Sequence, residues 1–104
     1  MKLLNAFSLS MVSPPCSIHV TAVEDPQTVI AGRPVESFVG HADTARIFSR
    51  ILGIPVEARR ESVRLESGER ALIGQYVGPR LPEGTTELPE GAKIVWMMVE
   101  IMRH

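Results

Sequence analysis

The chain of 104 residues is long enough for one domain with one hydrophobic core, but not for two. Hydrophobic residues make up 44% of it and charged residues 22%, the balance of a soluble globular protein, and no apolar run reaches the roughly 18 residues of a membrane span. The formal charge of -1 gives no overall field that would recruit duplex nucleic acid, so any anion site must be local.

The N-terminal part of the chain predicts two strands separated by a loop. Lys2–Phe7 predicts the first strand, and Ser8–Pro15, with three serines and a double proline, predicts the loop. Ser17–Val23 is rich in β-branched residues and predicts the second strand, in which His19 is expected to be structural. Cys16 is the single cysteine, so no internal disulfide can form. This fits a reducing cytoplasm.

The middle of the chain predicts a strand followed by a helix. Asp25-Pro26 can open a short helix first, because proline suits the first helical position. Val35–Val39 then predicts a buried strand, and Gly40 breaks it. From residue 43 or 44 to the expected C-cap at Gly53 the pattern is helical. Its apolar residues recur at spacings of three and four, and its charged residues share the other side.

His41 stands beside the predicted start of this helix. A helix N-terminus presents free N–H groups and the positive end of a dipole, both of which attract phosphate. A histidine there can donate a hydrogen bond to a bound anion or exchange a proton with it. The residues alone leave a second interpretation open, in which His41 only caps the helix or satisfies a buried carbonyl.

The C-terminal part predicts a hairpin, a long loop and a last strand. Ser62–Glu66 and Arg70–Val77 flank the turn residues Ser67-Gly68 and predict the hairpin. Gly78–Gly91 is rich in glycine and proline, and a loop of this length in a small domain is usually functional or disordered. Lys93–Met102 is nearly all apolar and predicts a central strand buried on both faces, with a buried helix as the alternative.

The chemistry that these residues offer is limited. The histidines are widely separated and no HExxH or CxxC spacing occurs, so no metal site or other cofactor site is expected. No GxSxG, GxGxxG or Walker motif occurs either. The remaining polar candidates suit holding a phosphate and moving a proton: His41, Asn5, Ser8, Ser10, Arg80 and Glu83.

Three short motifs resemble those of the viral ring nuclease family, whose members are anti-CRISPR enzymes of archaeal viruses and bacteriophages with relatives in bacteria. The motifs are NAFSLSM at Asn5–Met11, GHADTA at Gly40–Ala45 and GQYVGPRLPEG at Gly74–Gly84. The resemblance covers nearly the whole chain, so residues 1–104 are expected to form a single ring nuclease domain. It implies an α/β fold in which helices flank a mixed β-sheet. It also implies a homodimer that binds cyclic tetra-adenylate, the second messenger of type III CRISPR systems, in a groove between the subunits.

The resemblance also assigns site residues. The family's catalytic histidine falls on His41, and the arginine and glutamate of its closing loop fall on Arg80 and Glu83, where Glu83 orients either His41 or a ribose 2′-hydroxyl. Further ligand contacts of the family fall on Asn5, Ser8, Gln75 and Arg60, although the spacing from the glutamine to the arginine is one residue longer here than in some members. Asp43 replaces a serine of other members, and we expect it to cap the helix and point away from the ligand.

The implied reaction needs no metal, because the nucleophile is a 2′-hydroxyl of the substrate itself. The resemblance implies that the ring is cut to linear di-adenylates with 2′,3′-cyclic phosphate ends, with His41 as general acid. This would switch off the antiviral response that the messenger activates. The alternatives are a protein that binds and sequesters cyclic oligoadenylates without cutting them, a small regulator, and a structural dimer whose loop contacts protein.

Overall fold

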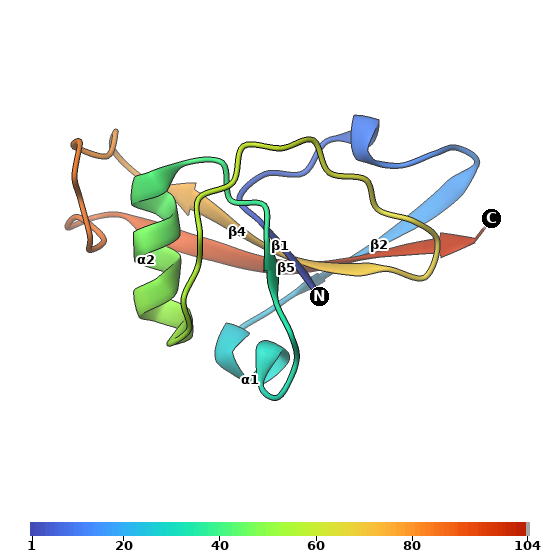
Figure 1. Ribbon diagram of the computed structural model, residues 1–104, viewed down its shortest axis with the longest axis horizontal. Coiled ribbons are helices and arrows are strands. Elements are labelled where there is room, and N and C mark those ends of the chain that lie inside the picture. Colours follow the sequence, from blue (N-terminus) through green and yellow to red (C-terminus); the bar gives the residue numbers. More distant parts are fainter. Residues whose placement is uncertain (104) are drawn as a thin grey trace.

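The computed structural model describes residues 1–103, which form a five-stranded mixed sheet with two α-helices on one face (Figure 1). This confirms the predicted fold class, an α/β fold with a mixed sheet and helices. In chain order the elements are strand β1 (Lys2–Leu4), a 3₁₀ helix (Leu9–Met11), strand β2 (Cys16–Ala22), helix α1 (Pro26–Ile30), strand β3 (Glu36–Ser37), helix α2 (Ala42–Leu52), strand β4 (Arg70–Val77) and strand β5 (Lys93–Arg103).

The strand order across the sheet is β2-β5-β4-β1-β3. β1 runs parallel to both β3 and β4, whereas β5 runs antiparallel to both β4 and β2. β5 is a strand, as predicted, and lies inside the sheet. Trp96 is buried on the helix side of β5 and Val99 on the other side, so the expected burial on both faces holds for the middle of the strand, while Lys93 and Met102 are exposed.

Helix α2 is specified by its two ends and its apolar stripe. His41 is the N-cap, and Gly53 ends the helix in the left-handed conformation with φ +71°, donating its N–H to the Ser49 carbonyl at 2.9 Å. Phe48 is fully buried against the sheet, with its ring centroid 4.8 Å from that of Trp96. This packing holds the middle of the helix against β4 and β5.

Gly74 on β4 has no side chain, and this leaves room for the rings of Phe48 and Trp96. A Cβ atom at Gly74 would lie 2.6 Å from ring atoms of both. We therefore expect Gly74→Ala to lower the free energy of unfolding by about 1–3 kcal/mol through overpacking, measured by urea denaturation. Gly40→Ala is the matched control, because its Cβ would meet only Arg60 Cγ at 3.6 Å. An equal loss in both variants would contradict the steric explanation.

The predicted hairpin between Ser62–Glu66 and Arg70–Val77 is wrong. Residues 62–66 form no strand, and β4 pairs with β1 and β5 instead. Apolar and polar residues alternate in this segment for another reason: Val63 and Leu65 are buried over the sheet face opposite the helices. Leu65 donates its N–H to the Met11 carbonyl of the 3₁₀ helix at 2.8 Å. The segment thus covers the sheet and does not extend it.

Several element boundaries differ from the predicted ones. β1 ends at Leu4 and not at Phe7, and β3 retains two residues of the predicted strand Val35–Val39. β2 begins one residue earlier than expected, and α1 begins at Pro26 with Asp25 as its N-cap, as predicted. Residues 78–92 contain no helix or strand, which confirms the long loop. None of the helices within residues 1–103 is long and apolar enough to cross a membrane.

Candidate functional site

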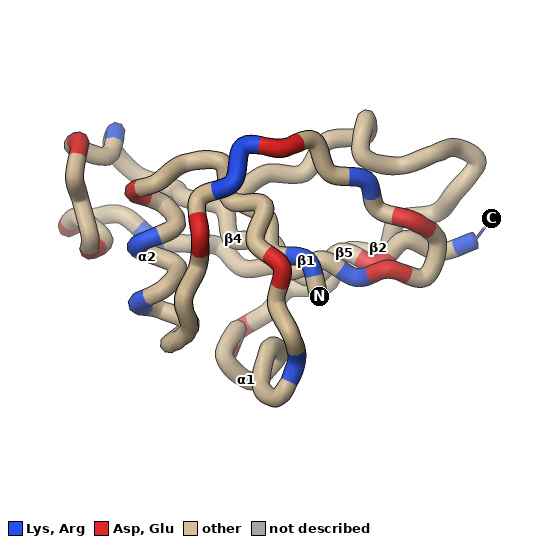
Figure 2. The backbone as a smooth tube through the Cα atoms, viewed as in Figure 1, with Lys and Arg blue, Asp and Glu red and all other residues tan. Residues whose placement is uncertain are grey.

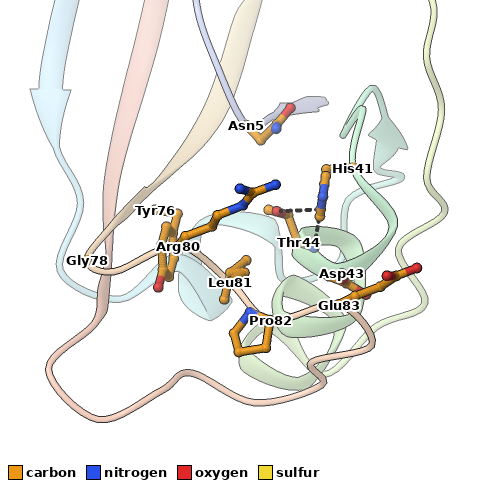
Figure 3. Close-up of a pocket in the computed structure, with 10 residues that line it drawn as sticks. All are labelled: Asn5, His41, Asp43, Thr44, Tyr76, Gly78, Arg80, Leu81, Pro82 and Glu83. Carbon is orange, nitrogen blue, oxygen red and sulfur yellow. Dashed lines mark hydrogen bonds between the residues drawn. The ribbon is translucent and has the colours of Figure 1, made fainter.

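Four of the predicted site residues line one open cleft of about 930 Å³ (Figure 3). They come from three separate segments: the end of β1, the start of α2 and the long loop after β4. The lining residues are Asn5, His41, Asp43, Thr44, Tyr76, Gly78, Arg80, Leu81, Pro82 and Glu83. The cleft lies where β1 and β4 end, which is also where the N-terminus of α2 meets the sheet.

His41 caps helix α2, and it also lines the cleft, so its capping role does not remove it from the site. Its Nδ1 lies 3.4 Å from the Thr44 backbone nitrogen and 3.4 Å from Thr44 Oγ1. While Nδ1 accepts the Thr44 N–H, a neutral ring carries its hydrogen on Nε2. When the ring is doubly protonated, Nδ1 becomes a donor, and Thr44 Oγ1 is the neighbour that can accept from it. Thr44 can therefore hold the ring in both states.

Asn5 ties the end of β1 to the turn before His41. Its Oδ1 accepts the N–H of Gly40 at 3.2 Å. The same turn is held from outside by Arg60, whose Nε donates to the Gly40 carbonyl at 3.2 Å. Asn5 therefore positions the glycine bend that brings His41 to the cleft.

The long loop supplies the opposite wall of the cleft. Within residues 1–103 neither the Arg80 guanidinium nor the Glu83 carboxylate takes part in an ion pair. In Figure 3 the guanidinium of Arg80 points toward the side where Asn5 and His41 lie, whereas the carboxylate of Glu83 points away from Arg80. Tyr76 donates its hydroxyl hydrogen to the Pro79 carbonyl and so fixes the start of the loop. An unpaired arginine facing an open cleft suits an anionic ligand.

Asp43 does not cap the helix, which corrects the expectation from sequence. The helix begins one or two residues earlier than predicted, so the cap position falls on His41 and Asp43 lies inside the first turn. Asp43 is buried and lines the cleft, and its carboxylate accepts from Arg46 at 2.5 Å and from the Gly84 N–H at 3.2 Å. Asp43 thus points toward the loop of the site and not away from it.

Three other predicted residues lie outside this cleft. Ser8 caps the 3₁₀ helix by accepting the Ser10 N–H at 3.3 Å. Arg60 lines an adjoining hollow of about 710 Å³, which shares Asn5 with the cleft. Gln75 is exposed on β4 opposite Val95, on the sheet face away from the helices. Their assignment as ligand contacts stays a prediction.

Sequence reasoning did not single out Thr44 or Tyr76 for the site. The signal for Thr44 was present, because a residue three positions after an N-cap presents its backbone N–H to the capping side chain. Tyr76 could be assigned to the site only after the strand pairing showed that its side chain lies on the face of β4 that lines the cleft. Among residues 1–103 no group of three or more His, Cys, Asp or Glu side chains is placed to hold a metal ion.

Comparison with known proteins identifies the fold. The family described as STIV B116-like matches residues 1–94. Among solved structures, B116 of Sulfolobus turreted icosahedral virus is similar with a TM-score of 0.75 and 24% sequence identity, over 95% of this chain and 97% of that one. At this identity the likeness shows a shared fold. The search among curated proteins found no match.

Proposed function

We propose that this chain, which belongs to the STIV B116-like family, is a metal-independent ring nuclease that cleaves cyclic tetra-adenylate to linear di-adenylates. The motif resemblance suggests the substrate. The observation that carries the proposal is the cleft that joins a helix-capping histidine to an unpaired arginine, an asparagine and a glutamate. These groups are suited to hold a phosphodiester and protonate a leaving oxygen.

The reaction starts with a group that RNA already carries. The 2′-oxygen of one ribose attacks the adjacent phosphorus, the bond from phosphorus to the 5′-oxygen breaks, and a 2′,3′-cyclic phosphate remains. The departing 5′-oxygen takes a proton from Nε2 of the doubly protonated His41 ring, which becomes neutral; Nε2 is the ring nitrogen that does not face Thr44. Proton transfer of this kind contributes about 10²–10⁴-fold in rate. In-line orientation of the ribose supplies the remaining acceleration.

The loop residues have separate tasks in this scheme. Arg80 neutralises charge on the phosphate, which grows as the 2′-oxygen adds. Among residues 1–103 no hydrogen bond joins Glu83 to His41, whose ring contacts Thr44. This favours the other role expected of Glu83, namely to orient the attacking 2′-hydroxyl. In this scheme Glu83 also accepts the proton that the hydroxyl gives up.

A homodimer suits the symmetry of the substrate. A ring of four identical nucleotides has a two-fold axis, as does a C₂ dimer, so two copies of His41 can face opposite phosphodiesters. The sheet face away from the helices offers a surface for a second copy, since Val20 is 54% and Val77 43% exposed there. Gln75 lies on the same face as Val77, two residues before the end of β4, so this dimer would bring it to the interface.

One incubation tests the proposal against its rivals. Radiolabelled cyclic tetra-adenylate is mixed with the protein in excess EDTA and the products are separated by chromatography. We expect linear di-adenylates with cyclic phosphate ends, formed at the same rate with and without EDTA. Retention of the intact ring would support sequestration without catalysis, and absence of binding would contradict both functions. Strong inhibition by EDTA that added metal reverses would overturn the metal-free mechanism.

A further inference from the structure

We propose that Asp43 is the positioning residue that holds the turn Pro82–Thr85 against helix α2 and thereby sets the place of Glu83 relative to His41. The contact itself is independent of what the cleft binds. Its importance for ring cleavage rests on the proposed function.

The two carboxylate oxygens of Asp43 have different partners. Oδ1 accepts from the Arg46 guanidinium one turn along the helix at 2.5 Å, and Oδ2 accepts the backbone N–H of Gly84 at 3.2 Å. The Asp43 side chain is 10% exposed and that of Arg46 is 52% exposed. A hydrogen bond from a backbone N–H to a nearly buried carboxylate is stronger than one between neutral groups. The Gly84 contact is therefore a charge-assisted bond between the helix and the loop, beside the bond that Asp43 accepts from Arg46.

The turn geometry directs the Gly84 N–H toward the helix. The Thr85 N–H donates to the Pro82 carbonyl at 3.2 Å, and Gly84, in the third position, has φ +82°. This is the arrangement of a turn that needs glycine at that position. Glu83 occupies the second position of the same turn, one residue from the bond to Asp43. Holding the Gly84 nitrogen therefore holds the backbone of Glu83.

The loop follows one stripe of the helix beyond this turn. Glu87 pairs with Arg50 at 3.1 Å, two helical turns after Asp43, although both of these side chains are exposed. Between them Ile47 is 1% exposed without belonging to either hydrophobic cluster of the sheet. Figure 1 shows the loop beside α2, at the left of the view. The loop thus runs along the charged side of the helix, where Arg46 and Arg50 stay exposed and Asp43 makes the nearly buried polar contact.

The contact can be tested by hydrogen exchange of the Gly84 amide, followed by NMR on the full chain without ligand. In the wild-type protein we expect this amide to be protected by about tenfold or more relative to an unstructured peptide. Asp43→Ala should remove that protection while the amides of β4 and β5 keep theirs. Asp43→Asn should retain most of it, because the amide oxygen can still accept the Gly84 N–H.

Two matched variants separate this bond from its neighbours. Arg46→Ala removes the other partner of Asp43, and Arg50→Ala removes the exposed ion pair, so both should leave the Gly84 amide protected. Loss of protection in Arg46→Ala equal to that in Asp43→Ala would overturn the proposal. So would a wild-type Gly84 amide that exchanges at the unprotected rate, a result that needs no variant to fold.

The turnover measurement tests the positioning role. We expect kcat for cyclic tetra-adenylate to fall by about tenfold in Asp43→Ala, with partial rescue in Asp43→Asn. Unchanged kcat in a variant that has lost the Gly84 protection would overturn the positioning role. If the wild-type protein cuts no ring, the proposed function fails, and the exchange experiment still decides whether Asp43 holds the turn.

Discussion

Replacing His41 with asparagine should lower the rate of ring cleavage by about 10²–10⁴-fold while leaving the affinity for the ring nearly unchanged. Asparagine is among the best N-cap residues, so it can still accept the Thr44 N–H that His41 accepts at 3.4 Å. It cannot donate a proton to a departing alkoxide. The variant therefore separates the two roles that the structure gives His41, which a change to alanine would remove together. Single-turnover cleavage and equilibrium binding of the labelled ring measure the two effects.

The matched control is His19→Asn. His19 is exposed on β2 and does not line the cleft, so this change should alter neither binding nor rate. The thermal unfolding midpoint of His41→Asn should stay within about 2 °C of the parent value, because its cap is retained. Cleavage at the parental rate by a folded His41→Asn would contradict the assignment of His41 as general acid.

The helix ends could be predicted from the sequence where a single residue determines the local structure. Asp25-Pro26 opens α1 and Gly53 ends α2, because each cap depends on one residue: the Asp25 side chain accepts the Thr28 N–H, and Gly53 adopts the left-handed conformation. The cleft was also foreseen in part. His41 and Arg80 were expected to share it, and the structure brings them together.

The errors concern contacts between segments far apart in the chain. Val63 and Leu65 alternate like a strand, but an alternating segment can bury its apolar side chains by lying across a sheet as well as by pairing within it. Asp43 was expected to face away because a carboxylate repels phosphate. Its actual partner is a backbone N–H about 40 residues later in the chain, which no local pattern reveals. Gln75 shows the same limit, because only the strand register fixes its face.

The second large effect that we expect is the loss of ring binding in Arg80→Ala, because Arg80 brings a positive charge to the cleft. Figure 2 shows many of the charges on the segment between α2 and β4 and on the long loop, and none on β2. On the connecting segment Arg59 bridges Glu36 and Glu61. The hydrogen bonds that Arg59 donates to Glu61 and to Glu36 raise the pKa of its guanidinium above the ordinary value. That guanidinium is already neutralised by carboxylates. Arg80 has no such partner within residues 1–103 and faces the cleft (Figure 3).

A charged hydrogen bond to phosphate is worth about 1.5–3 kcal/mol, so Arg80→Ala should weaken binding of the ring by about 10- to 150-fold. The dependence of the dissociation constant on salt should become shallower, since one fewer cation meets the phosphates. Arg80→Lys keeps the charge but not the planar pair of donors, so it should recover part of the affinity. Arg33→Ala, at an exposed position outside the cleft, is the control and should bind normally. If Arg80→Ala binds the ring with the parental affinity and salt dependence, Arg80 does not contact the phosphate. The anion would then have to be held by the N-terminus of α2 and by Arg60 in the adjoining hollow.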